Sequence, residues 1–230
     1  MIKKNFDCLK FNKKIVNEGL APFNFGNVSI RINKNKFLIK PSGCNLNKAS
    51  PTDMVEVSIK DVKYRGGLNP SVDTPTHAEI YKNFINVNAV MHVHSEFLTI
   101  WSQAKKEIPI FGTTHADFSN SSIPVTKEIK SKIKLENYEL ETGKNIIATF
   151  KKKKLNPDTC PAILVANHGA FIWGKNLEDT FNNVLMLEFI AKLAYGTYVL
   201  NKNIKTIPKN LINKHFTRKN GSKSYYGQKK

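Results

Sequence analysis

The chain has 230 residues, of which 40% are hydrophobic and 23% charged, and its formal net charge is +18. This length supports one full-sized domain, or at most two small ones, and the composition is typical of a globular protein. Its three cysteines, Cys8, Cys44 and Cys160, form no C-x-x-C pair, which argues against a disulfide framework and against a zinc ribbon. We therefore expect all three to be reduced thiols.

The positive charge raises the question of a nucleic-acid partner. Only three of the 36 basic residues are arginine, the side chain best suited to bidentate contacts with bases and phosphates. The lysines are spread along the chain, with one dense run at residues 151–154. We therefore expect no nucleic-acid partner, and a smaller anion such as a sugar phosphate fits the charge equally well.

No segment is predicted to cross a membrane. The most apolar long stretch, residues 183–200, is interrupted by Glu188 and Lys192, so it is predicted to be a buried helix. The first 19 residues contain no apolar core of signal-peptide length. The sequence thus predicts a cytoplasmic protein without a membrane partner.

Segments with helical periodicity and segments of alternating polar and apolar residues are interleaved along the chain. In chain order they predict a helix at 2–20, strands at 23–32, 36–43 and 53–60, a helix at 74–84, a strand at 88–95, a helix at 96–106, two strands around a bend within 161–174, a helix at 176–201, and a short helix from 211. No composition boundary splits the chain, so we predict a single α/β domain spanning residues 1–230.

Two of the six histidines, His92 and His94, lie in an otherwise apolar predicted strand with one residue between them. Residues i and i+2 of a strand share a face, so these two imidazoles should project side by side. His168 ends another apolar strand just before Gly169, where the backbone can turn sharply. Three histidines with an open fourth position are typical of a catalytic zinc site, although packed, hydrogen-bonded histidines remain the alternative.

Small residues follow several of the predicted strands and could bind an anion. The segments "GNVS" (26–29) and "PSG" (41–43) can present backbone N–H groups, and "PSVDTPTH" (70–77) adds the start of a helix. Each of these segments could equally be a simple turn. Asp117, in "TTHADF", lies in a polar patch where an aspartate more often caps a helix than donates a proton.

Taken together, these motifs resemble the class II aldolase/adducin family and, within it, the L-ribulose-5-phosphate 4-epimerase branch. The resemblance covers nearly the whole chain in the same order, through "GNVS", "FLIKPSG", "DTPTH", "HVH", "GTTHADF", "YELETG", "NHGAFIWGKN" and "KHFTRKNGSKSYYGQ". It implies a metal-dependent sugar-phosphate epimerase with a three-layer α/β/α domain and a mixed, mostly antiparallel sheet. It also implies a cyclic homotetramer whose C-terminal tails, about residues 210–230, reach the neighbouring subunits.

The resemblance further assigns roles to individual residues. It implies one Zn²⁺ per subunit, or another divalent ion, held by His92, His94 and His168 with Asp73 beside it. It implies Asp117 and Tyr226 as the acid/base pair, with Tyr226 and His215 reaching into the site of the neighbouring subunit. For the substrate phosphate it implies Asn27, Lys40, Ser42, Gly43, Ser71 and Val72.

The chain departs from the family pattern at three positions. Val72 stands where a second serine is usual, "NHGAF" stands where "HSHGPF" is usual, and Val93 replaces a polar residue between the two histidines. The first departure removes one hydroxyl from the phosphate site but keeps a backbone N–H. The other two leave the candidate ligands in place.

Two other functions stay open on the same scaffold. A class II aldolase acting on fuculose or rhamnulose 1-phosphate would usually carry glutamate in place of Asp73. An adducin-like scaffold domain would not need the metal ligands or the acid/base residues.

The epimerase chemistry itself requires cleavage and re-formation of the C3–C4 bond, because C4 lies β to the C2 carbonyl and its hydrogen is not acidic. A Lewis-acidic metal favours that cleavage.

Overall fold

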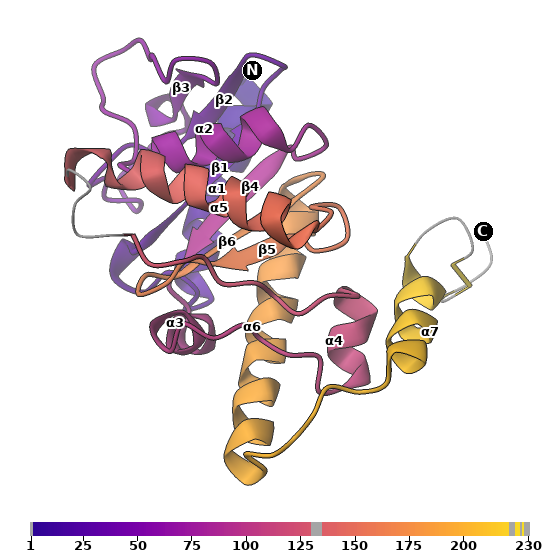
Figure 1. Cartoon of the computed structure of the whole chain (residues 1–230). Coiled ribbons are helices and arrows are strands. Elements are labelled where there is room, and N and C mark those ends of the chain that lie inside the picture. The colour runs from indigo at the N-terminus through magenta and orange to yellow at the C-terminus, as the bar shows by residue number, and fades with distance from the viewer. Residues whose placement is uncertain (1, 130–134, 221–223, 226, 228–230) are drawn as a thin grey trace.

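Six largely buried strands form a sheet at the centre of the molecule (Figure 1). The structure is a computed structural model that describes residues 2–129, 135–220, 224–225 and 227. The strands have the order β3-β2-β1-β4-β6-β5, and every ladder among the described residues is antiparallel. A single parallel bridge joins Val125 to Leu164. The predicted α/β class is confirmed.

The sheet consists of β1 (Gly26–Arg31), β2 (Lys36–Ile39), β3 (Val55–Ser58), β4 (Ala89–Val93), β5 (Ala162–Leu164) and β6 (Ala170–Gly174). The helices are α1 (Ile2–Asn17), α2 (Thr74–Asn83), α3 (Glu96–Gln103), α4 (Thr113–Phe118), α5 (Tyr138–Lys153), α6 (Leu177–Leu200) and α7 (Lys209–Lys219). Three short 3₁₀ turns lie at Pro22–Asn24, Pro51–Asp53 and Leu135–Asn137.

One face of the sheet is covered by α2 and α5, which pack against each other (Figure 1). Phe37 of β2 contacts Tyr81 of α2, with ring centroids 5.2 Å apart. Trp173 of β6 contacts Phe84 at 5.1 Å and Phe150 of α5 at 5.3 Å. These large buried rings fix α2 against the strands, and the first turn of α2 follows Asp73.

The opposite face is covered by α1, α3 and α6. Leu38, the neighbour of Phe37 on β2, points to this side and packs in a cluster with Cys8 and Leu9 of α1. Phe11 of α1 meets Phe181 of α6 edge to face. The three cysteines are free thiols, as predicted.

Two helices, α4 and α5, were not predicted from the sequence. Helix α5 buries residues at helical spacing, but the stripe is short and two of its members are Thr and Gly, with charged residues at both ends of the helix; the buried residues are Thr142, Gly143, Ile146, Ile147 and Phe150. Helix α4 has only six residues, too short for a periodic signal.

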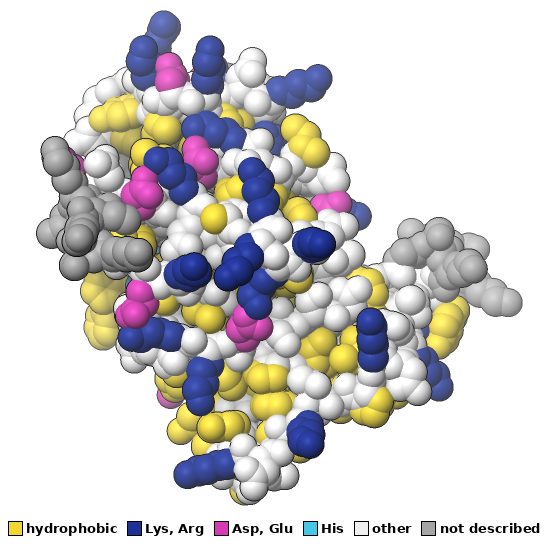
Figure 2. Space-filling view, in the orientation of Figure 1, with side chains coloured by type: hydrophobic (Ala, Val, Ile, Leu, Met, Phe, Trp, Pro, Cys, Tyr) yellow, Lys and Arg dark blue, Asp and Glu magenta, His cyan; other side chains and the backbone are white. Residues whose placement is uncertain are grey.

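Helix α6 is less buried than predicted, because only 28% of its most apolar window is buried. By length and composition alone it could cross a membrane, a test that the core helix of a globular domain also passes. One stripe packs on the sheet, while apolar side chains on the other side are exposed, namely Leu185, Met186, Phe189, Leu193 and Val199. Hydrophobic side chains are frequent on the lower part of the face in Figure 2, where α6 lies, and the basic side chains are scattered.

Candidate metal centre

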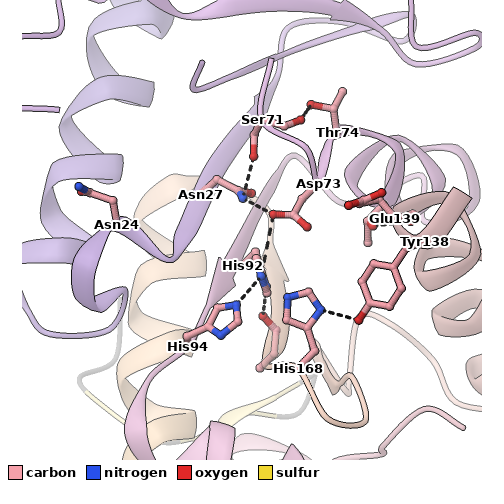
Figure 3. A network of polar contacts seen from close by, with 12 residues as sticks. Asn24, Asn27, Ser71, Asp73, Thr74, His92, His94, Tyr138, Glu139 and His168 are labelled. Carbon is pink, nitrogen blue, oxygen red and sulfur yellow. Dashed lines mark hydrogen bonds and ion pairs between the residues drawn. The ribbon is translucent and has the colours of Figure 1, made fainter. Parts of the chain in front are cut away.

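Three histidines converge at one end of the paired inner strands β4 and β6, on the face of the sheet covered by α2 and α5. The nearest ring nitrogens of His92, His94 and His168 all lie within 4.8 Å of one another, and Nε2 of His94 is 3.0 Å from Nε2 of His92. Figure 3 shows the three rings pointing toward a common point. The three rings therefore lie together, as the spacing of His92 and His94 and the bend at Gly169 predict.

The backbone around these rings is held by close packing. His92 pairs with Asn27 on β1 and with Phe171 on β6, and its ring stacks on Phe171 with centroids 4.3 Å apart. A Cβ atom at Gly26 would lie 2.6 Å from the carbonyl oxygen of His92, and one at Gly169 would lie 2.6 Å from that of Val93. Glycine is required at both positions because the chains approach too closely for any side chain.

The second nitrogen of two of the rings already has a partner outside the cluster. Nδ1 of His92 lies 3.0 Å from the carbonyl oxygen of Ala170, so it carries the proton and donates it there. Nδ1 of His168 lies 3.1 Å from the hydroxyl of Tyr138. These bonds leave Nε2 of each ring facing its neighbours, the arrangement in which histidines bind metals.

The electrostatics keep all three rings neutral at physiological pH. Burial lowers the pKa of His92 well below its usual range, and the nearby His168 and His94 lower it further. Burial lowers the pKa of His94 to about 4, with His168 contributing. Burial also lowers the pKa of His168, against an opposing effect from Asp73. Neutral imidazoles have free lone pairs, so the donor set fits a divalent metal ion.

A carboxylate stands beside the histidines. Asp73 precedes α2, and its Oδ2 atom lies 3.9 Å from Nε2 of His92. The amide nitrogen of Asn27 donates to the same oxygen at 2.7 Å and to the hydroxyl of Ser71 at 3.0 Å. This network fixes the carboxylate of Asp73 toward the rings, as Figure 3 shows.

The histidines open onto a cavity of about 310 Å³. It brings together most of the residues implied for phosphate binding, and its lining is Asn24, Gly26, Asn27, Ser42, Gly43, Ser71, Val72, Asp73, His92, His94, Glu139 and His168. Lys40 is not among these residues. Its side chain is buried, burial lowers its pKa, and its Nζ donates to the carbonyl oxygen of Asn24 at 3.2 Å.

The two segments that border this cavity are tied to each other. The N–H of Ser71 donates to the carbonyl oxygen of Lys40, and the N–H of Ser42 donates to that of Asn69, both at 2.9 Å. Two of the backbone donors expected to face an anion are therefore used inside the protein. Val72 is 63% exposed, so the side chain that replaces the usual serine projects outward.

Comparison with known families agrees with this architecture. The model of the class II aldolase and adducin N-terminal domain matches residues 7–195. The chain belongs to the class II aldolase/adducin family. Among solved structures, L-fuculose 1-phosphate aldolase is 22% identical, with 93% of this chain and 94% of that chain covered and a TM-score of 0.72.

Other members of the family have the same fold. YgbL from Klebsiella pneumoniae, whose reaction is given as aldolase, epimerase or decarboxylase, is 20% identical over 92% of this chain and 97% of its own, with a TM-score of 0.71. A sugar-phosphate aldolase from Thermotoga maritima is 18% identical over 90% and 98%, with a TM-score of 0.67. At these identities the likeness concerns the fold alone.

Asp117, one of the two acid/base residues implied by the family resemblance, lies apart from the histidines within one chain. Asp117 belongs to α4 and does not line the cavity. Its carboxylate accepts two hydrogen bonds from Arg218 of α7, at 2.9 and 2.5 Å, and lies 3.1 Å from Nδ1 of His215. Figure 1 shows α4 beside α6 and α7 packed on the other side of α4, away from the sheet. Tyr226 lies outside the described residues.

Sequence reasoning assigned no role to Tyr138, Glu139 or Asn24. Glu139 and Asn24 line the cavity, and Tyr138 contacts His168. The first two residues of α5 lie within "YELETG", a segment used only to support the family resemblance. The signal was therefore present as a motif, but without the helix α5 nothing placed it near the histidines.

Proposed function

We propose that this chain is an L-ribulose-5-phosphate 4-epimerase that interconverts L-ribulose 5-phosphate and D-xylulose 5-phosphate with a divalent metal ion, zinc being the expected one. The observation that carries the proposal is the cluster of three neutral histidines beside Asp73, at the edge of a cavity bordered by two small-residue turns. His92, His94 and His168 would hold the ion, with Asp73 beside it.

The phosphate would bind at the opposite wall of the cavity from the histidines. Gly43 and Val72 line that wall, and neither N–H is used in a backbone hydrogen bond among those of the described loops. The positive φ of Gly43, 61°, is a conformation that glycine adopts readily. The hydroxyls of Ser42 and Ser71 would complete the grip on the phosphate. The amide nitrogen of Asn27 already donates to Asp73 and Ser71, so Asn27 would act by orienting these two side chains.

The reaction needs a base and an acid at C4. The C4 hydroxyl gives its proton to a base as the C3–C4 bond breaks. The aldehyde fragment, still held by its phosphate, then turns its other face, and an acid returns a proton to the C4 oxygen as the bond forms again. When bound, a divalent ion supplies Lewis-acid stabilisation of the negative charge that develops on the other fragment.

Asp117 and Tyr226 are the proposed base and acid. Burial alone raises the pKa of Asp117, but hydrogen bonds from Arg218 and His215 outweigh it and lower the pKa below the usual range. Asp117 is therefore ionised at neutral pH, which suits a base. His215 would act through Asp117 by orienting its carboxylate.

A second copy of the chain would bring Asp117 to the cavity, because within one chain Asp117 lies outside it. The exposed apolar side of α6 supports an oligomer, since such a surface usually marks a protein contact. A closed ring, such as the proposed homotetramer, would place the α4–α7 region of each subunit beside the histidines of the next.

A class II aldolase acting on fuculose or rhamnulose 1-phosphate is the second candidate. The observation that favours it is that two of the similar solved structures carry aldolase names. Against it stands Asp73, where the family resemblance leads one to expect glutamate in an aldolase.

The test is to measure metal content and two reactions on the same purified protein. We expect about one zinc per chain and conversion of L-ribulose 5-phosphate to D-xylulose 5-phosphate. Release of dihydroxyacetone phosphate and a free aldehyde from fuculose or rhamnulose 1-phosphate, without epimerisation, would establish the aldolase instead. Metal-free protein with neither reaction would support a scaffold role.

A further inference from the structure

Tyr138, the first residue of α5, lies directly behind one of the candidate metal ligands. Its hydroxyl is 3.1 Å from Nδ1 of His168, and the two ring centroids are 5.8 Å apart. Tyr138 does not line the cavity, whereas its neighbour Glu139 does. Figure 3 shows the Tyr138 hydroxyl aimed at the nitrogen of His168 that faces away from the other two histidines.

The contact decides which nitrogen of His168 carries the proton. A neutral histidine that binds a metal through Nε2 must keep its proton on Nδ1. That proton points at the oxygen of Tyr138, which can accept it. With Tyr138 as acceptor, His168 is held in the one tautomer and the one ring orientation that direct Nε2 toward His92 and His94.

The position of Tyr138 is fixed by the packing of α5 on α2. The hydroxyl of Thr76 in α2 donates to the backbone carbonyl of Glu139 at 2.6 Å. A Cβ atom at Gly143 would lie 2.8 Å from the side chain of Glu79, so the two helices touch at the next turn. The same first turn of α2 follows Asp73. Tyr138 thus links the third histidine to the helix that places the carboxylate.

The other histidine with an outer bond has a different kind of partner. His92 donates to a backbone carbonyl, that of Ala170, which is set by the pairing of β4 with β6. His168 sits in the turn between β5 and β6, after Asn167 with a positive φ of 63°, and depends on a side chain. A single side-chain substitution can therefore remove the partner that orients the ring of His168, whereas none can remove the backbone carbonyl that orients His92.

We propose that Tyr138 is a positioning residue for the metal centre. Its hydroxyl oxygen accepts a hydrogen bond from Nδ1–H of His168 and thereby raises the affinity of the site for its ion. This inference rests on the proposed metal-dependent function. Outer partners of this kind typically change metal affinity by about 10- to 100-fold.

The experiment compares zinc affinity in the wild type, Tyr138→Phe and Tyr64→Phe, by competition with a chromophoric chelator. Tyr64 is a matched control because its exposed hydroxyl also makes one side-chain hydrogen bond, to Asn69 at 2.6 Å. We expect zinc affinity to fall about 10- to 100-fold in Tyr138→Phe and to stay within twofold of the wild type in Tyr64→Phe.

A second measurement separates positioning from general loosening. In zinc-loaded protein with ¹⁵N-labelled histidine, the Nδ1 proton of His168 should exchange slowly with water in the wild type and rapidly in Tyr138→Phe. His168→Gln identifies the signal. Should Tyr138→Phe fold poorly, 3,5-difluorotyrosine at position 138 keeps the shape; measured at a pH low enough to keep its more acidic phenol neutral, it is a weaker acceptor and should give an intermediate affinity.

The outcomes are distinguishable. A wild type that binds no zinc overturns the proposed function and, with it, the role of Tyr138. A wild type that binds zinc, with unchanged affinity and proton exchange in Tyr138→Phe or its fluorinated counterpart, overturns the role of Tyr138 alone.

Discussion

The histidine cavity and the cluster around Asp117 are built in contrasting ways. The cavity is assembled from adjacent strands, close glycine contacts and short hydrogen bonds, so one chain completes its ligand set. Asp117 instead is held by Arg218 and His215 of α7, about 100 residues away in the sequence, and lies outside the histidine cavity. Metal binding should therefore be a property of the single chain, and catalysis a property of the assembly.

The largest effect should come from removing a ligand on β4. His92→Ala deletes an Nε2 donor at the centre of the cluster and leaves a gap against Phe171. We expect loss of bound zinc and a fall in epimerase activity of roughly 10³-fold or more, because the ion supplies the main charge stabilisation. His115→Gln, which changes a histidine outside the cluster, should retain zinc; a zinc-free but fully active His92→Ala protein would disprove the assignment.

Mixing two inactive variants tests directly whether metal binding and catalysis depend on different subunits. Asp117→Asn should retain zinc but lose most activity, since it weakens the base and its pairing with Arg218. If one site takes its histidines from one subunit and Asp117 from the next, refolding Asp117→Asn with His92→Ala should restore about a quarter of the sites in random tetramers. No regain of activity in verified mixed oligomers would place both groups in one chain.

A smaller effect is expected at Glu188, which joins α6 to the turn after His94. Its carboxylate accepts hydrogen bonds from the hydroxyl of Ser95 at 2.7 Å and from the N–H groups of Phe97 and Leu98 at 2.8 and 3.1 Å. Glu188→Ala should lower the free energy of unfolding by about 1.5–3 kcal/mol, because it leaves the first turn of α3 without its acceptor. Urea denaturation of the metal-free protein measures this, with Glu178→Ala, at an exposed ion pair, as control.

The smallest effect concerns pH. Burial lowers the pKa of His115 to about 4, whereas in the unfolded chain it stays near 6.5. Between these values the unfolded chain binds one more proton at this site, so the free energy of unfolding should decrease as pH falls, by on the order of 1 kcal/mol per pH unit. Denaturation midpoints at pH 6.5 and 4.5 should show a shallower dependence in His115→Gln than in the wild type; equal slopes would contradict this.

The histidine cluster could be predicted from the sequence better than the surroundings of Asp117, for a physical reason. The strand rule, with residues i and i+2 on one face, placed His92 beside His94 without any structure. The partners of Asp117 could not be found in this way. They depend on the path of the chain after α6, which no local period encodes. Tyr138 and Glu139 were missed because the buried stripe of α5 is short and partly polar, so the helix was not predicted.

The predicted helix at α6 is confirmed, but it is less buried than expected. Glu188 and Lys192 interrupt the apolar stretch, but Glu188 serves α3 and does not mark a solvent-facing side. A composition rule predicts that such a charge is exposed, whereas here a half-buried carboxylate accepts hydrogen bonds from three donors.

Helix α6 also has a mechanical consequence. It carries the sheet along its first half, through Thr180 and Val184, and α4 along its second half, where Ile190, Leu193 and Thr197 border His115. Its 24 residues span about 36 Å at 1.5 Å per residue. The length of α6 therefore sets the spacing between the sheet that carries His92 and the helix α4 that carries Asp117. In the proposed oligomer, a shorter or longer α6 would shift Asp117 relative to the histidines of the next subunit.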